Sequence, residues 1–140
     1  MTLISPEMRD AVSRRAHNRC EYCQLSQDSQ VATFPVDHII PLAEQGQTVL
    51  SNLALACLGC NAAKWIHVKG VDPESGDRVL LFNPRMHIWD EHFRWSDSDP
   101  TIVASLTPIA RGTVALLELN PPPRLAIRRW LMVIGEHPPK

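Results

Sequence analysis

The chain has 140 residues, a formal net charge of −1 and 44% hydrophobic residues. This length suits one domain or a small core with an appendage, and the composition is that of an ordinary globular protein. No apolar run approaches the roughly 18 residues that cross a bilayer, and the first residues lack the apolar stretch of a secretory signal. We therefore expect no membrane partner and a cytoplasmic location. The near-neutral charge argues against a broadly basic nucleic-acid binder, but clustered charges or a bound cation can still attract a nucleic acid locally.

A helix is predicted near the N-terminus. Ser5 supplies a hydroxyl at the N-cap, and Pro6 occupies the first helical position, a combination that favours helix initiation. Met8 and Val12 follow at helical spacing on one side. We expect this helix to reach about residue 17, with its apolar side packed on the core.

Two apolar segments then predict a hairpin with a long connection. Residues 34–42 and 49–56 are rich in valine, isoleucine and leucine, and the turn between them contains Gly46. A short helix is expected over residues 61–68. Gly70 is expected to end it, because glycine commonly follows the last helical turn.

The second half of the chain predicts a short strand and two helices. Residues 79–82 are strand-like, one helix is expected from Thr107-Pro108 to about residue 119, and Asn120-Pro121 precedes the other. An apolar face at helical spacing on the last helix predicts that this side packs inward. Its members are Ile127, Trp130, Leu131 and Ile134.

The four cysteines form two CxxC pairs, Cys20 with Cys23 and Cys57 with Cys60. A CxxC turn supplies two thiolates from one tight loop, and two such turns complete a tetrahedral zinc site. Four protein ligands leave no open coordination position, so we interpret the site as structural. A redox dithiol is the alternative, but the thioredoxin-like strand and helix context is missing.

Four polar residues between and beside the cysteine pairs have the chemistry of a hydrolytic site: Asp37, His38, Asn52 and Asn61. An imidazole can take a proton from water near neutral pH, and carboxylate and amide oxygens suit Mg²⁺. Each residue alone is more often an ordinary surface or turn residue, so the interpretation depends on the combination. Neighbours on a regular strand point to opposite faces. Asp37 and His38 can therefore share a site only if the backbone bends there.

These residues resemble the HNH endonuclease family. The resemblance rests on RCEYC at 19–23, VDHIIPL at 36–42, NLALAC at 52–57 and CLGCNAAK at 57–64, and it extends over roughly residues 14–69. It implies an α+β protein with a ββα-metal core and a four-cysteine zinc site, flanked by an N-terminal helix and a C-terminal helical extension. We divide the chain into residues 1–70, the HNH core with its zinc knuckles, and residues 71–140, an extension packed on the same domain.

The resemblance also implies a role for each polar residue. His38 would be the general base that activates water, and Asn52 would hold the loop between the strands. Asp37 and Asn61 would bind a catalytic Mg²⁺ or Mn²⁺, with Asn61 standing where many members have a histidine. The family usually carries two glycines in the turn after VDHIIPL, whereas this chain has EQGQ at 44–47.

Duplex DNA is the substrate that the resemblance implies, bound mainly through its phosphates. The candidate phosphate contacts are Arg14, Arg15, Arg19, Lys64 and Lys69. Three alternatives stay open: a zinc-stabilised binding module without catalysis, a ribonuclease or toxin with the same site, and a nuclease that acts as a homodimer or as an accessory to a larger complex.

Overall fold

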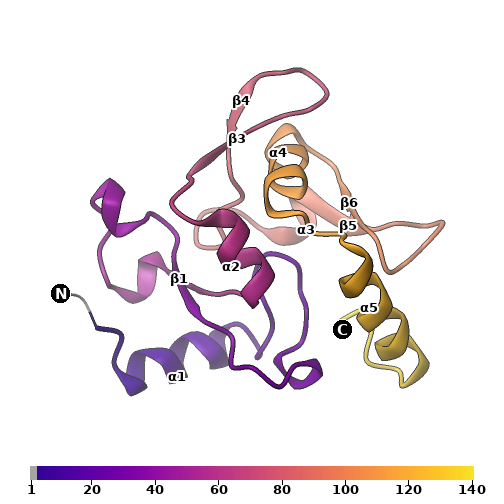
Figure 1. Cartoon of the computed structure of the whole chain (residues 1–140), viewed down its shortest axis with the longest axis horizontal. Coiled ribbons are helices and arrows are strands. Elements are labelled where there is room, and N and C mark those ends of the chain that lie inside the picture. The colour runs from indigo at the N-terminus through magenta and orange to yellow at the C-terminus, as the bar shows by residue number, and fades with distance from the viewer. Residues whose placement is uncertain (1–2) are drawn as a thin grey trace.

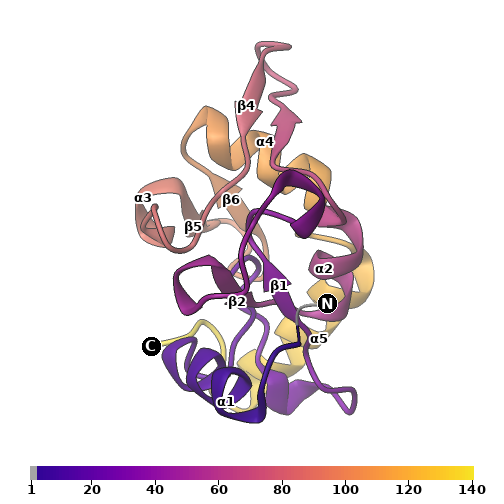
Figure 2. The same ribbon diagram turned by 90° about the vertical axis from the view of Figure 1, so that its left-hand side faces the viewer.

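The computed structural model describes residues 3–140 and shows a mixed α+β arrangement (Figures 1 and 2). Two short strands, β1 (Val36–His38) and β2 (Leu53–Leu55), pair antiparallel with Asp37 opposite Ala54. Helix α2 (Leu58–Lys64) follows β2 after two residues. The predicted hairpin is therefore confirmed, although its strands are shorter than the apolar segments. Short 3-10 turns occupy parts of the connection.

Helix α1 (Pro6–Arg15) closes one side of this hairpin. The Ser5 hydroxyl caps it by accepting a hydrogen bond from the Met8 amide, as predicted. Val12 is fully buried, and Met8 packs against the same core. Arg15 donates to the carbonyl oxygen of Leu53 at 2.6 Å, so α1 also holds the start of β2.

The helix predicted over residues 61–68 is present but begins three residues earlier and ends four residues earlier, and Gly70 does not end it. Helix α2 begins at Leu58 because the Cys57 sulfur accepts a hydrogen bond from the Cys60 amide. It ends at Lys64, after which Trp65 adopts a φ of 47°. Gly70 lies within strand β3 (Lys69–Val71), close to helix α4 (Pro108–Leu117). A β-carbon at Gly70 would lie 3.2 Å from a carbonyl oxygen of α4, so the glycine permits close packing.

The second half of the chain adds two further hairpins and two helices. Strands β3 and β4 (Arg78–Leu80) form a hairpin that projects from one end of the molecule (Figures 1 and 2). The short helix α3 (Trp89–His92) leads into β5 (Phe93–Trp95), which pairs with β6 (Val103–Ser105). The Asn120 side chain holds β6 by bonding both the amide and the carbonyl of Val103, at 2.8 and 3.0 Å.

The last helix, α5 (Pro122–Val133), exists as predicted, and its predicted inward face is correct in part. Leu131 is buried and Ile127 packs against the core, whereas Trp130 is 64% exposed and Ile134 is 52% exposed. Arg124 and Arg128 are buried in addition. Apolar periodicity did not predict the buried arginines, because α5 lies beside the cysteine cluster and Arg124 donates a hydrogen bond to the Cys60 sulfur. No helix within residues 3–140 is both long and apolar enough to span a membrane.

Candidate functional site

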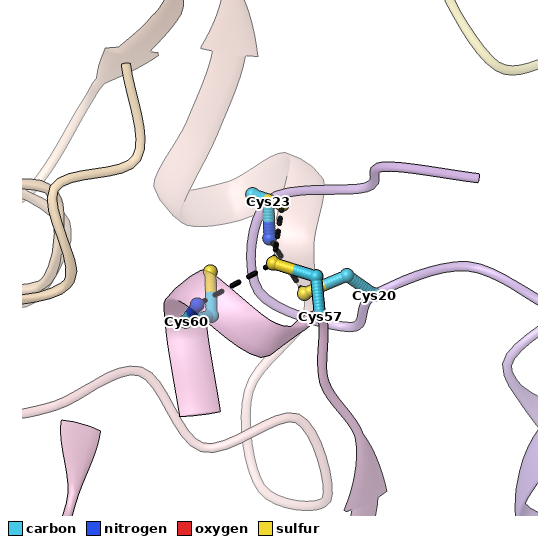
Figure 3. A group of neighbouring side chains, drawn as sticks. All are labelled: Cys20, Cys23, Cys57 and Cys60. Carbon is cyan, nitrogen blue, oxygen red and sulfur yellow. Dashed lines mark hydrogen bonds between the residues drawn. The ribbon is translucent and has the colours of Figure 1, made fainter. Parts of the chain in front are cut away.

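The four cysteines meet at one buried point, as Figure 3 shows. Cys20 and Cys23 come from the loop after α1, Cys57 is the N-cap of α2, and Cys60 lies in the first turn of α2. All four sulfur atoms lie within 4.8 Å of one another, and the sulfurs of Cys23 and Cys57 are 3.7 Å apart. In each CxxC turn, the amide of the second cysteine donates to the sulfur of the first at 3.4 Å.

This geometry fits a metal and excludes a disulfide. The sulfurs of a tetrahedral zinc site with Zn–S bonds of about 2.3 Å lie about 3.8 Å apart, close to the separation of the Cys23 and Cys57 sulfurs. A disulfide needs about 2.05 Å, and all four cysteines are free. The predicted four-cysteine cluster is therefore present, with the donor set that zinc prefers.

Two arginines from α5 surround this cluster, and the sequence analysis missed both. Arg124 is 8% exposed and donates from Nη1 to the Cys60 sulfur at 3.2 Å. Burial disfavours its charged form, but the nearby cysteine sulfurs, Cys60 first, outweigh burial and raise the pKa of Arg124. Arg128 is 1% exposed. The spacing of four residues between the arginines, which puts them on one side of a helix, was the available signal.

Asp37 lies in a buried polar cluster beneath the hairpin. Its carboxylate accepts a hydrogen bond from the Tyr22 hydroxyl at 2.7 Å and pairs with the Lys64 ammonium at 3.1 Å. Burial raises the pKa of Asp37, with Lys64 and Tyr22 acting in the opposite direction. Burial also raises the pKa of Tyr22, as does the adjacent Asp37 carboxylate. Tyr22 therefore remains a hydrogen-bond donor to Asp37.

Asp37, His38 and Asn61 line one solvent-open pocket of about 250 Å³, which Trp65 and other apolar residues complete. The strand ends at His38, and the chain bends at residues 39–40. The expected bend between Asp37 and His38 is absent, because both residues belong to the regular strand β1, yet both border the pocket. Nε2 of the half-buried His38 lies 2.9 Å from the Thr48 hydroxyl.

The Asn52 side chain holds the loop above the pocket. Its Oδ1 accepts from the Ile40 amide at 2.9 Å, and its Nδ2 donates to the carbonyls of Ile40 and Gln47 at 3.0 and 2.9 Å. Asn52 precedes β2 and is not part of it. The loop has one glycine, and a β-carbon at Gly46 would lie 1.7 Å from the Ile40 carbonyl oxygen. Glycine at position 46 therefore allows the backbone of this loop to pack against the Ile40 carbonyl, where any side chain would clash.

The candidate phosphate contacts have different surroundings. The structure contradicts the prediction for Lys64, whose side chain is 1% exposed and donates to Asp37 and to the carbonyls of His38 and Ile39. Arg15 and Arg19 bond backbone carbonyls. Arg14 is exposed and paired with Asp10, and Lys69 is exposed on β3.

The hairpin, the helix after it and the clustered cysteines together have the arrangement of a ββα-metal unit. Residues 20–65 match the model of a family described as HNH endonuclease. The match spans every residue of the pocket and cysteine cluster that the sequence analysis named. No curated protein matches the chain, and no solved structure does.

Proposed function

We propose that the protein is a metal-dependent endonuclease that hydrolyses phosphodiester bonds in duplex DNA. The observation that supports this most is the shared, solvent-open pocket lined by Asp37, His38 and Asn61. These side chains come from β1 and α2, which the hairpin and the cysteine cluster hold together. The family match to residues 20–65 supports the same chemistry.

His38 is the proposed general base. We assign Nε2 as the donor in its 2.9 Å contact with the Thr48 hydroxyl. This neutral tautomer would leave the lone pair of Nδ1 free to accept a proton. Nδ1 would take the proton of a water molecule that attacks the scissile phosphate. Asn52 acts indirectly, because its three hydrogen bonds fix the loop that also carries Thr48.

Asp37 and Asn61 would hold the catalytic divalent ion. Both residues line the pocket and carry hard oxygen donors, which favour Mg²⁺ or Mn²⁺. A carboxylate has about four lone-pair positions, so Asp37 retains acceptor capacity beside Tyr22 and Lys64. When bound, the ion would stabilise negative charge on the phosphate and the leaving oxygen. Zinc at the four cysteines would be structural, because all its ligands come from the protein.

Phosphate contacts would come from the exposed cations Arg14 and Lys69, assisted by the backbone-bound Arg15 and Arg19. With few such cations, we expect weak, salt-sensitive binding and modest sequence preference. A single pocket would cut one strand at a time, so cleavage of both strands would need a homodimer, an accessory role in a larger complex, or two binding events.

Plasmid nicking tests the proposal. The zinc-loaded protein is expected to nick supercoiled DNA with Mg²⁺ or Mn²⁺ and to be inactive with EDTA. Zinc content is measured after the chelator is removed, so that restored activity with Mg²⁺ alone separates the two metals. A matched RNA is assayed in parallel. Cleavage of RNA only would indicate a ribonuclease, and binding without cleavage of either polymer would indicate the non-catalytic module.

Replacing Asn52 with alanine is expected to lower cleavage at least tenfold and the free energy of unfolding by roughly 2–3 kcal/mol, because buried backbone groups lose their partners. Asn120→Ala is the matched control. That side chain also makes three hydrogen bonds, two to Val103 and one from Arg128, but it lies outside the pocket. Urea unfolding and nicking rates are compared. Equal loss of cleavage in both variants would contradict a specific role for Asn52.

A further inference from the structure

We propose that α5 is part of the cysteine metal centre: Arg124 and Arg128 neutralise the excess negative charge of the metal-bound thiolates, so that metal binding holds this helix on the HNH core. The proposal depends on a divalent metal at the cysteines and does not depend on nuclease activity. It assigns a role to the C-terminal extension, which the family match at residues 20–65 does not reach.

Arg124 makes the direct contact. Its guanidinium is buried and donates a hydrogen bond to the sulfur of Cys60, which lies 64 residues earlier in the chain. None of the ion pairs within residues 3–140 involves Arg124, so no carboxylate lies within 4.0 Å of its charged nitrogens. A buried cation without an anion is strongly unfavourable. The anion nearest to Arg124 is therefore the sulfur cluster itself.

Gly59, inside the second CxxC turn, makes room for this contact. A β-carbon at this position would lie 2.4 Å from Nη2 of Arg124 and 3.3 Å from its guanidinium carbon. Glycine in the first turn of a helix costs about 0.5–1 kcal/mol relative to alanine, and α2 carries that cost here. The fit between Gly59 and Arg124 is a second, independent sign that the guanidinium is built into the centre.

Arg128 supplies the second charge from one helical turn further along α5. Its Nη1 donates to the Thr101 carbonyl and its Nη2 to the Leu119 carbonyl, both at 2.8 Å. Nη2 also lies 3.5 Å from the Cys23 carbonyl, and the guanidinium carbon is 5.4 Å from the centre of the Trp95 ring. Neutral acceptors orient this cation without cancelling its charge. Among the described residues, Arg128 also forms no ion pair with a carboxylate.

The charges balance when a divalent metal is bound. Four thiolates around one divalent cation leave two excess negative charges, and the two guanidinium groups supply two positive charges. Loss of the metal is therefore expected to weaken the contact between α5 and the knuckles, and loss of Arg124 is expected to weaken metal binding in return.

Zinc release to an excess of a chromogenic chelator tests this coupling in the full chain. Arg124→Met keeps the length of the side chain and removes its charge, and it is expected to release zinc at least about tenfold faster than the native protein. Arg124→Lys keeps the charge and should fall between the two. Arg129→Met, which alters an exposed arginine on the same helix, should match the native rate. Native release rates in Arg124→Met would overturn the proposal.

A double-mutant cycle with Gly59 sharpens the test. Gly59→Ala is expected to accelerate zinc release in the native background, because its β-carbon displaces the guanidinium, and to have little further effect in the Arg124→Met background. Additive effects of the two substitutions would overturn the assigned contact.

Hydrogen exchange on the unmodified protein provides a readout that needs no variant. Chelation of zinc should remove amide protection from residues 122–133 together with the two knuckles. Full protection of α5 after zinc loss would overturn the coupling. Protein that binds no metal at its cysteines would also overturn it, whatever the outcome of plasmid nicking. Loss of nicking with normal zinc retention would leave the coupling intact and reject only the proposed nuclease function.

Discussion

His38→Ala is expected to reduce plasmid nicking by about 10²–10⁴-fold, the usual contribution of a general base. The half-buried imidazole has one side-chain hydrogen bond, to Thr48, so its removal should have little effect on folding. The measurement is the initial nicking rate at saturating Mg²⁺, with the thermal midpoint and zinc content determined on the same preparation. Unchanged cleavage by a folded, zinc-loaded His38→Ala protein would refute the assignment of the base.

His67→Ala is the matched control for this experiment. His67 is exposed and lies near the pocket in sequence, with its ring centre 5.9 Å from that of Trp65. Its loss removes an imidazole from the same region without touching the proposed base. We expect nicking within about twofold of the native rate, since surface substitutions away from a site have small effects. An equal loss in both variants would point to a general electrostatic effect of the histidines and not to proton transfer by His38.

Cys57→Ser is expected to prevent stable folding at 25 °C. Structural zinc contributes about 10–16 kcal/mol of apparent binding free energy in small metal-dependent folds, whereas a domain of this size is stabilised by about 5–15 kcal/mol. Serine can still cap α2, as Cys57 does for the Cys60 amide, so the substitution isolates the loss of the metal ligand. Circular dichroism, urea unfolding and zinc content measure the effect.

Ala54→Ser controls for placing a hydroxyl in this part of the core. Ala54 is fully buried in β2, opposite Asp37, and serine there should destabilise the protein by about 1–3 kcal/mol without releasing zinc. A zinc-free Cys57→Ser protein that unfolds at the native urea concentration would show that the cysteines do not stabilise the fold through a metal.

Local sequence signals predicted the parts of the site that depend on local structure. The two CxxC turns set the position of the sulfurs, and Ser5 marked the start of α1. The bend expected between Asp37 and His38 is absent, because both lie in the regular strand β1. The surroundings of Asp37 were not predictable in the same way. They depend on Lys64, which lies 27 residues away along the chain and folds back under the hairpin.

The errors arose where long-range packing overrides local preference. A lysine at a helix end is typically solvated, but Lys64 finds one carboxylate and two carbonyls within reach. Apolar spacing on the last helix pointed to Trp130 as an inward residue, but the neighbouring surface of the core is a cluster of sulfur atoms that attracts Arg124. Gly70 was read as a helix end because its contact with α4, more than forty residues later, has no local signature.

The buried Lys64–Asp37 pair makes the fold of the pocket independent of the divalent ion that we propose there. Because the Lys64 ammonium already offsets the Asp37 carboxylate at 3.1 Å, the hairpin needs no divalent ion to neutralise that carboxylate. The Lys64 ammonium would also repel a divalent ion that binds Asp37 and so weaken its binding. Occupancy of the proposed Mg²⁺ site should therefore depend on the free Mg²⁺ concentration. Under the proposed function, folding would depend on zinc that stays bound at the four cysteines, whereas cleavage would depend on a Mg²⁺ or Mn²⁺ ion that exchanges with solvent.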